Sequence, residues 1–221
     1  MTASQVLSAA LPFWEKLSEQ DREMFSTGCL TKSFAKGEII NRFDEGCQGA
    51  ILLQNGQIRI YIVSDEGREV TLYRLHTGDI CVLSASCLLD SIAFDVAIEA
   101  MERTEALLLP SAALHQVMER NPYVDLFLAK TANERFSDVM WTMQRILFCG
   151  ADRRVAAFLW DEMIKTGRMP LSYTHDEIAR CIGSAREVVT RILKYFAQEG
   201  IVALERGKVL ILDREKLQAC L

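Results

Sequence analysis

Hydrophobic and polar positions divide the chain into three stretches. From about residue 34 to residue 110, short runs rich in Val, Ile, Leu and Tyr are separated by glycines, and hydrophobic residues alternate with others in "IRIYIV". That alternation, with Gly56, Gly67 and Gly78 at turn positions, is typical of antiparallel strands. Short strands at such regular spacing favour a small barrel or sandwich. One or two short helices should precede them, with a start signal at Ser18.

The pattern of residues 111–149 is helical and unusually long. Their hydrophobic positions recur at spacings of three and four, which is typical of a heptad seam that packs against a partner helix. The seam therefore predicts a homodimer. The alternative is that the helix packs on its own β domain, and part of it should do so. The seam comprises Ala129, Ala132, Phe136, Val139, Met143 and Ile146, and we expect the dimer interface at Phe136, Val139, Met143 and Ile146.

The remaining stretch predicts a helix-turn-helix. "RVAAFLWDEMIKTG" has the pattern of a helix closed by its glycine, and "LSYTHDEIARCIGSAREVVTRILKYFAQEG" divides into two helices around Gly183. Thr174 with Glu177, and Ser184 with Glu187, have the spacing of capping boxes, in which a hydroxyl and an acid satisfy backbone N–H groups at a helix start. Two helix starts so close together require a sharp turn between the helices.

A hairpin should follow the two helices, because "IVALERGKVLILD" predicts two short strands around a tight turn that would form a wing. Helix, turn, helix and wing together are a DNA-binding arrangement when the second helix presents polar side chains at its N-terminal end. Arg186, Glu187, Thr190 and Arg191 lie opposite the apolar positions of that helix. These four are therefore the candidate base-reading residues.

These polar side chains suit the major groove chemically. An arginine can bind O6 and N7 of guanine with two hydrogen bonds, and a glutamate can accept one from N4 of cytosine, so the set is fit to read G·C pairs. The alternative is a solvated helix face on which Glu187 only caps the helix. We expect DNA contacts at Ser184, Arg186, Glu187, Thr190 and Arg191, with Lys208 added from the wing.

Composition and charge narrow the class of protein. Half of the 221 residues are hydrophobic, no run is apolar enough to span a membrane, and the N-terminus lacks a leader pattern, so we expect a cytoplasmic protein without membrane contact. Net charge is −5, yet residues 168–221 hold nine Lys or Arg against seven Asp or Glu, a weak sign of nucleic acid binding. Seven scattered cysteines favour free thiols. Three histidines, none near a nucleophile motif, argue against an enzyme.

Two stretches resemble a known family. "THDEIARCIGSAREVVTRILKYFAQEGIV" resembles the C-terminal motif of the cyclic AMP receptor protein and fumarate and nitrate reduction regulator (Crp/Fnr) superfamily, and "FAKGEII" with the glycine spacing resembles its barrel. The resemblance implies an α+β fold. Its parts would be a cyclic-nucleotide-binding-type β-barrel (jelly roll) with short N-terminal helices at residues 1–116, a dimerisation helix at 117–149 and a winged helix-turn-helix DNA-binding domain at 150–221.

The resemblance also implies a function. It predicts a homodimeric transcriptional regulator that binds an inverted-repeat operator in double-stranded DNA, contacts RNA polymerase and responds to a small effector in its barrel. Arg186, Glu187 and Arg191 fall on the base-reading positions of the cyclic AMP receptor branch, whereas the fumarate and nitrate branch lacks the first arginine. The alternative function is a sensory and dimerisation module whose winged helix binds protein, which would need no such triad.

Cyclic AMP does not suit the sensor region "GDICVLSASCLLDSIAFDV". The family's cyclic AMP binders hold the phosphate with an arginine, but this chain has none between Arg74 and Arg103. Leu83 stands where their ribose-binding glutamate would be, and Val139 and Met140 replace the hydroxyl pair that contacts adenine. A buried cyclic phosphate without a cation would be costly. These differences argue against cyclic AMP as the effector.

Other cofactors also match the family poorly. Its iron–sulfur members use closely spaced N-terminal cysteines, and this N-terminus offers only Cys29. Cys81 matches an axial cysteine of the haem-binding, carbon-monoxide-sensing members, but their histidine is missing and only His76 lies nearby. Cys81 and Cys87 could also form a thiol or metal sensor or simply pack in the core, and an uncharged small effector remains equally compatible. The effector-pocket candidates are Cys81, Leu83, Cys87, Val139 and Met140.

Overall fold

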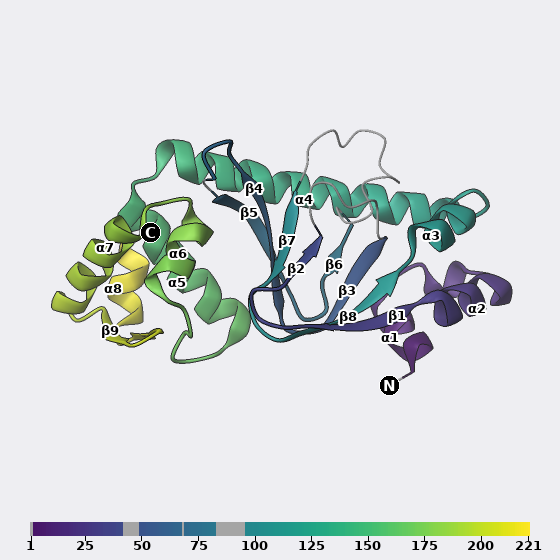
Figure 1. The fold of residues 1–221 in the computed structure, drawn as a ribbon, viewed down its shortest axis with the longest axis horizontal. Coiled ribbons are helices and arrows are strands. Elements are labelled where there is room, and N and C mark those ends of the chain that lie inside the picture. Colours follow the sequence, from purple (N-terminus) through teal and green to yellow (C-terminus); the bar gives the residue numbers. More distant parts are fainter. Residues whose placement is uncertain (1, 42–48, 68, 83–95) are drawn as a thin grey trace. The chain divides into compact units, whose positions relative to one another are not determined.

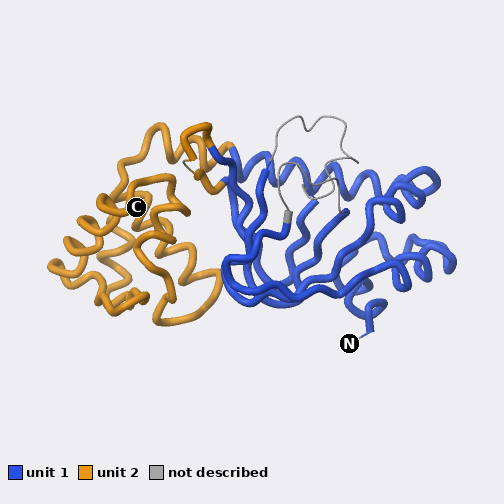
Figure 2. Tube along the Cα trace, in the orientation of Figure 1, with its two compact units in different colours: residues 1–63, 72–139 blue, residues 64–71, 140–221 orange. Residues whose placement is uncertain are grey.

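The computed structural model describes residues 2–41, 49–67, 69–82 and 96–221. The chain forms two compact units, one of residues 1–63 and 72–139 and the other of residues 64–71 and 140–221 (Figure 2). The first contains most of the predicted β domain together with the N-terminal part of the long helix. The second contains the predicted helix-turn-helix and wing.

The first unit is built on two antiparallel four-stranded sheets, with strand orders β1-β8-β3-β6 and β2-β7-β4-β5 (Figure 1). The predicted short strands are thus confirmed, and Gly56 and Gly78 adopt positive φ angles at turns between them. Gly56 has a further constraint, because a Cβ there would lie 2.8 Å from the carbonyl oxygen of Arg103. The strands are β1 (Leu30–Phe34), β2 (Ile39–Asn41), β3 (Ala50–Asn55), β4 (Gln57–Val63), β5 (Glu69–His76), β6 (Ile80–Cys81), β7 (Ala97–Ala100) and β8 (Thr104–Leu109).

Alternate residues of the strands supply two different cores. Ile51 of β3 and Leu108 of β8 join the cluster that also contains Ile58, Ile60 and Ile98 from the second sheet. Their neighbours along β3 and β8 pack instead with the N-terminal helices and with α3 and α4. The period of two in the sequence therefore fills both sides of the first sheet with apolar side chains.

Short helices surround this sheet. They are α1 (Ala3–Ala10), the 3₁₀ turn η1 (Trp14–Lys16), α2 (Glu19–Gly28) and α3 (Ser111–Met118). The predicted start signal is confirmed, since the Ser18 side chain accepts a hydrogen bond from the backbone N–H of Asp21. The carboxylate of Asp21 in turn pairs with Arg120, which ties α2 to the segment after α3.

The long helix α4 (Pro122–Phe148) runs beside the sheets (Figure 1). Its N-terminal half is held by Val124 and Leu128, which are fully buried against the first sheet and the short helices. Further along, Val139 packs on the core between the sheets. Phe136 and Met143 remain 64% and 50% exposed. One side of α4 therefore packs on its own domain, as the alternative reading of the seam expected, and another side stays uncovered in the single chain.

The second unit has a compact core of its own, in which Val189, Leu193 and Phe196 pack with Ile178 and Leu159. The predicted helix ends at Gly167, which adopts the left-handed conformation, and Gly183 does the same between the two helices of the predicted helix-turn-helix. The elements are α5 (Ala151–Thr166), α6 (His175–Ile182), α7 (Arg186–Gln198), β9 (Val202–Glu205), β10 (Lys208–Ile211) and α8 (Arg214–Ala219).

One of the two predicted capping boxes forms and the other does not. At the start of α6, Thr174 accepts from the backbone of Glu177 and Glu177 accepts from the backbone of Thr174. The prediction for Ser184 and Glu187 is wrong, because α7 begins at Arg186 and its capping residue, Ala185, makes no side-chain hydrogen bond. The reason lies in the preceding turn.

That turn uses Ser184 to end α6 rather than to begin α7. The backbone N–H of Ser184 donates to the carbonyl oxygen of Ala179 at 2.9 Å, and that of Gly183 belongs to the same C-terminal cap. Left-handed glycine followed by such a reverse bond satisfies the last carbonyls of a helix. Ser184 therefore lies one residue too early to cap α7, and Glu187 is left without that partner.

Candidate nucleic-acid interface

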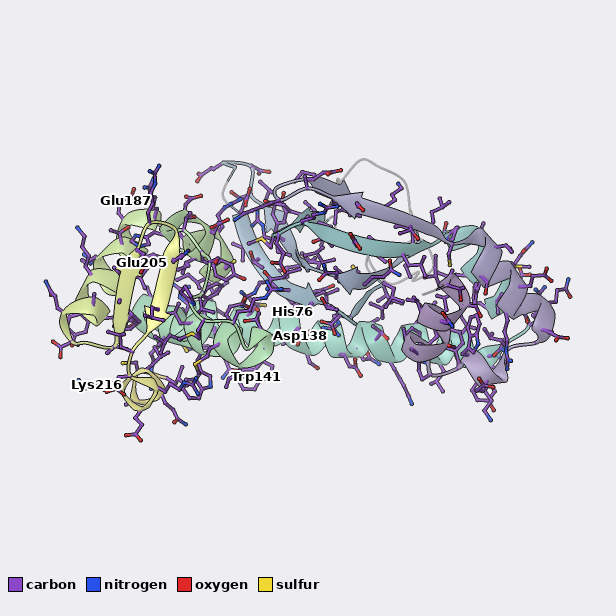
Figure 3. All side chains as sticks on the ribbon, turned by 90° about the horizontal axis from the view of Figure 1, so that it is seen from below. His76, Asp138, Trp141, Glu187, Glu205 and Lys216 are labelled. Atoms are coloured by element: carbon purple, nitrogen blue, oxygen red, sulfur yellow. The ribbon has the colours of Figure 1, made fainter. Side chains whose placement is uncertain are left out.

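Helix α7 presents the predicted base-reading residues because its other side is anchored. Val189, Leu193 and Phe196 are at most 2% exposed, and their spacing of three and four keeps one face of the helix in the core. Arg186 and Glu187 on the first turn are exposed. Figure 3 shows Glu187 at the surface of this unit, where α7 begins.

The charged groups of this face, Arg186, Glu187 and Arg191, make no ion pair or side-chain hydrogen bond with the part of the chain that the structure describes. An ionised side chain that lacks such a partner gives up only bound water when it binds a nucleic acid. The three side chains can therefore meet base edges without first breaking a bond inside the protein.

Thr190 is held differently from these three. Its Oγ1 lies 3.0 Å from Nδ1 of His175, the first residue of α6. Partial burial, followed by the positive charges of Arg186 and Lys194, lowers the pKa of His175 below its usual value. The imidazole thus links the two helices of the motif and lies in a positive electrostatic field. Sequence reasoning missed His175; its place directly after a capping residue is the only signal that singles it out.

The wing forms as predicted and carries cations at its tip. Strands β9 and β10 pair antiparallel, with Lys208 opposite Glu205. Gly207 closes the turn with a φ of 71°, a conformation that side chains other than glycine rarely adopt. Lys208 and its neighbour Arg206 are exposed. Two cations at the tip of a hairpin beside a recognition helix suit contacts with the DNA backbone.

The remaining predicted DNA contact, Ser184, is half-buried at the turn before α7. Its backbone N–H is already used by Ala179, so only its hydroxyl is left for a phosphate. The structure thus brings Ser184, Arg186, Glu187, Thr190 and Arg191 together on two turns of chain and adds Lys208 from the adjacent hairpin strand.

The predicted effector-pocket residues lie in different environments. Cys81 is fully buried in the core between the sheets, and Val139 packs against that core from α4. Met140 is 45% exposed. Leu83 and Cys87 lie outside the described residues, so the structure does not place the second thiol of the proposed pair.

Comparison with known proteins identifies both parts of the chain. The Crp-like helix-turn-helix domain matches residues 153–220, and the cyclic nucleotide-binding domain matches residues 31–121. The crystal structure of a proposed transcriptional regulator of the Crp/Fnr family from Eubacterium rectale is 42% identical, covers 96% of this chain and 98% of its own, and superposes with a TM-score of 0.89. The chain belongs to the Crp/Fnr family of transcriptional regulators.

Two curated members of the Crp/Fnr family come from different branches. The cyclic AMP receptor protein of Thermus thermophilus is 26% identical over 94% of this chain and 95% of its own length. The transcriptional activator protein Anr of Pseudomonas protegens is also 26% identical, over 84% of this chain and 77% of its own. The expected α+β fold and the function in DNA-binding regulation, rather than catalysis, are confirmed by these matches.

Regulators of this family bind DNA through the helix-turn-helix and act as dimers. Across the described residues of this chain, we found no helix with both the length and the apolar character needed to cross a membrane.

Proposed function

We propose that this regulator binds an inverted-repeat operator and reads its G·C pairs with Arg186, Glu187 and Arg191. The observation that carries the proposal is the state of these side chains: each lies on a face of α7 opposite the buried residues and lacks a partner in the described chain. Arginine suits guanine and glutamate suits cytosine. The resemblance of these three positions to the cyclic AMP receptor branch implies a half-site like TGTGA, with Arg186 at the outer guanine, Arg191 at the inner guanine and Glu187 at the cytosine of the inner pair.

A two-fold dimer would place the two copies of α7 about one helical turn of DNA, roughly 34 Å, apart. The dimer proposal is supported by the uncovered side of α4, where Phe136, Met140, Met143 and Leu147 are between 45% and 64% exposed. Their spacings of four, three and four are those of a heptad seam. An apolar stripe of this length is seldom left in water.

The interface proposed here differs slightly from the sequence prediction. Phe136 and Met143 stay in it, while Met140 and Leu147 join them. Val139 is used mainly by the core between the sheets, and Ile146 is half-buried. Val139 and Ile146 would lie at the edge of the dimer interface. The domain limits of 1–116, 117–149 and 150–221 remain our proposal for the division of sensor, dimer helix and DNA-binding domain.

We also propose that the signal is a small effector other than cyclic AMP. Support comes from the absence of a phosphate-holding arginine in the sequence after β5 and from the apolar character of Val139 and Met140. At an operator, the regulator would then act on RNA polymerase. Transcription in vitro from a promoter carrying the selected site would show this as a changed transcript yield that requires intact Arg186.

The test of base reading is selection from a random-sequence DNA pool by the full-length chain. The expected result is an inverted repeat whose half-site loses its preference at the outer G·C pair alone in Arg186→Ala. Arg214→Ala, a change of an exposed arginine on α8 of the same domain, is the matched control and should leave the half-site unchanged. A pool without an inverted repeat would refute the proposal and favour the protein-binding alternative. Half-site preferences that survive loss of both Arg186 and Arg191 would refute the residue assignment.

A further inference from the structure

His175 contacts Thr190 across the two helices of the helix-turn-helix. Nδ1 of its imidazole lies 3.0 Å from Oγ1 of Thr190. His175 is the first residue of α6, Thr190 lies in the second turn of α7, and both side chains are half-buried. Thr190 is also one of the predicted base-reading residues. A candidate base-reading hydroxyl is therefore bonded to a side chain that sequence reasoning missed.

The hydroxyl of Thr190 differs from that of other helical threonines in this chain. A threonine inside a helix often donates its hydroxyl hydrogen to the backbone carbonyl one turn earlier. Such bonds form, at 2.8, 3.0 and 2.6 Å, in Thr27, Thr131 and Thr166. Within the described chain Thr190 makes no bond of this kind, and its hydroxyl is bonded to His175. The hydroxyl hydrogen of Thr190 is therefore available to the imidazole.

The surroundings of His175 favour its neutral form. Arg186 precedes Thr190 by one turn of α7 and Lys194 follows it by one turn, so the three side chains form a row along the helix. Partial burial, followed by the positive charges of Arg186 and Lys194, lowers the pKa of His175 below its usual value. The imidazole is therefore neutral at pH 7.5 and gains a proton only in acid.

The acids that follow His175 on α6 are paired with other groups. Asp176 lies 3.4 Å from Nε of Arg180, one turn later on the same helix. Glu177 accepts hydrogen bonds from the backbone N–H and the hydroxyl of Thr174. These carboxylates therefore stabilise the start of α6 and do not hold a proton on the imidazole.

The wing is the other charged element close to this end of α6. A Cβ at Gly207 would lie 4.0 Å from Cγ2 of Thr174, the residue before His175. Among the described charged groups, Arg186 and Lys194 are the ones that shift the pKa of His175. The charged side chains around the wing turn are Glu205, Arg206 and Lys208.

The protonation state of the ring decides what the Thr190 hydroxyl offers to DNA. A neutral imidazole has one donor nitrogen and one acceptor nitrogen, whereas a protonated imidazole has two donors. When Nδ1 of neutral His175 accepts from the hydroxyl, Oγ1 of Thr190 keeps only lone pairs for a base. When Nδ1 carries a hydrogen and donates to Oγ1, the hydroxyl hydrogen is released and Thr190 becomes a donor as well.

We propose that His175 is a positioning residue for base recognition, which takes the hydroxyl hydrogen of Thr190 and leaves Thr190 as a hydrogen-bond acceptor in the major groove. Cytosine and adenine present donors there, at N4 and N6, whereas guanine and thymine present acceptors. Thr190 should therefore favour a cytosine or an adenine at the base that it faces. This inference rests on the proposed function, because it adds one read position to those of Arg186, Glu187 and Arg191. His175 itself contacts no base.

Selection from a random-sequence DNA pool by the full-length chain, at pH 7.5 and at pH 5.0, tests this role. Thr190→Val keeps the branched shape and removes the hydroxyl, so the base position whose preference it alters is the one that Thr190 reads. There the unaltered protein should prefer cytosine or adenine about five-fold at pH 7.5, the usual worth of one hydrogen bond. That preference should disappear at pH 5.0. His175→Asn has no titrating ring, so its preference should be the same at both pH values.

Nitrogen NMR of the free protein supplies a test without DNA. At pH 7.5 the imidazole of His175 should carry its hydrogen on Nε2 and leave Nδ1 as an acceptor. The signal is assigned by its loss in His175→Asn. A hydrogen on Nδ1 at this pH would overturn the inference and leave the proposed function untouched.

The outcomes of the selection separate this inference from the proposed function. The guanine preferences assigned to Arg186 and Arg191 should be the same at both pH values, which shows that the protein is folded and bound at pH 5.0. An inverted repeat with no base position altered by Thr190→Val, or with a pH-independent preference there, would overturn the role of His175 alone. A preference for guanine or thymine at pH 7.5 would do the same. A pool without an inverted repeat would refute the proposed function and this inference with it.

Discussion

His175 and Thr190 join the two helices of the DNA-binding motif through a contact of 3.0 Å between Nδ1 and Oγ1. Thr190 lies one turn beyond Arg186 on α7, so the imidazole supports the same helix on which Arg186 and Arg191 are exposed. Because partial burial, together with the charges of Arg186 and Lys194, lowers the pKa of His175, a proton on this ring opposes the folded arrangement.

The stability of the protein should therefore depend on pH through His175. Its folded pKa lies below the unfolded value of about 6.5, so its contribution is fully present above that pH and is lost as the pH falls through the folded pKa. We expect the melting temperature of His175→Asn to decline less than that of the unaltered protein between pH 7.5 and pH 5. His115→Asn, which changes an exposed histidine on α3, is the control. Parallel pH profiles for all three proteins would contradict the assignment.

Glu187 should act in DNA reading and not in helix capping. Since α7 is capped by Ala185 without a side-chain bond, Glu187→Ala should change the free energy of unfolding by less than about 0.5 kcal/mol. Thr174→Ala removes a real cap and should cost about 1 kcal/mol. Chemical denaturation compares the two, and DNA selection should show altered base preference for Glu187→Ala. Equal destabilisation by the two changes would show that Glu187 also supports the fold.

Charge in the exposed stripe should separate the subunits. Met143 is half-exposed on α4, so Met143→Glu would bring two carboxylates together at the two-fold axis and should give monomers that fail to bind the operator. Gln144→Glu adds the same charge one position further along the helix, outside the heptad seam, and should remain dimeric. Sedimentation at micromolar concentration distinguishes them. Monomeric behaviour of the unaltered chain would exclude this interface.

Lys208 should contribute affinity without sequence preference. It lies at the start of β10 on the exposed tip of the hairpin, where a phosphate is the natural partner of its ammonium group. Lys208→Gln should weaken all DNA sequences alike and reduce the slope of log affinity against log salt by about 1. Binding of operator and random duplexes at several salt concentrations measures both. A loss confined to the operator would reveal base contact instead.

Cyclic AMP should not bind. A calorimetric titration of the dimer should show no saturable heat in the micromolar range, because the sequence has no phosphate-holding arginine between Arg74 and Arg103. The same titration with cyclic GMP controls for nucleotide binding in general. Micromolar affinity for cyclic AMP, with a matching gain in operator affinity, would show that cyclic AMP is the effector.

Much of this structure could be predicted from the sequence because it depends on interactions between residues close together in the chain. Alternation over β4 predicted a strand, and the spacing of Val189, Leu193 and Phe196 predicted which face of α7 would be buried. Gly183 indicated the turn because few other residues adopt a φ of 62°. Each of these features depends on residues within about two turns of one another.

The features that escaped prediction depend on contacts between distant segments or on competition for one group. Ser184 and Glu187 have the spacing of a capping box, but Ser184 closes the end of α6 and α7 begins one residue later than that box requires. Tyr73 and Arg135 lie on a strand and a helix far apart in sequence, and only the fold reveals that the guanidinium carbon of Arg135 lies 5.6 Å from the centre of the Tyr73 ring.

The short turn between α6 and α7 also fixes how α7 is rotated about its own axis. Gly183 ends one helix, Ser184 closes its cap and Ala185 already precedes the next, so the link contains no spare residue. One inserted residue that extended α7 at its start would rotate the added turn by about 100° relative to the anchored face. Arg186 would then point along the protein surface instead of toward a groove. The length of this linker should therefore influence which base sequence is recognised as much as the side chains themselves do. Homologues that read the same half-site should tolerate substitutions here more readily than insertions.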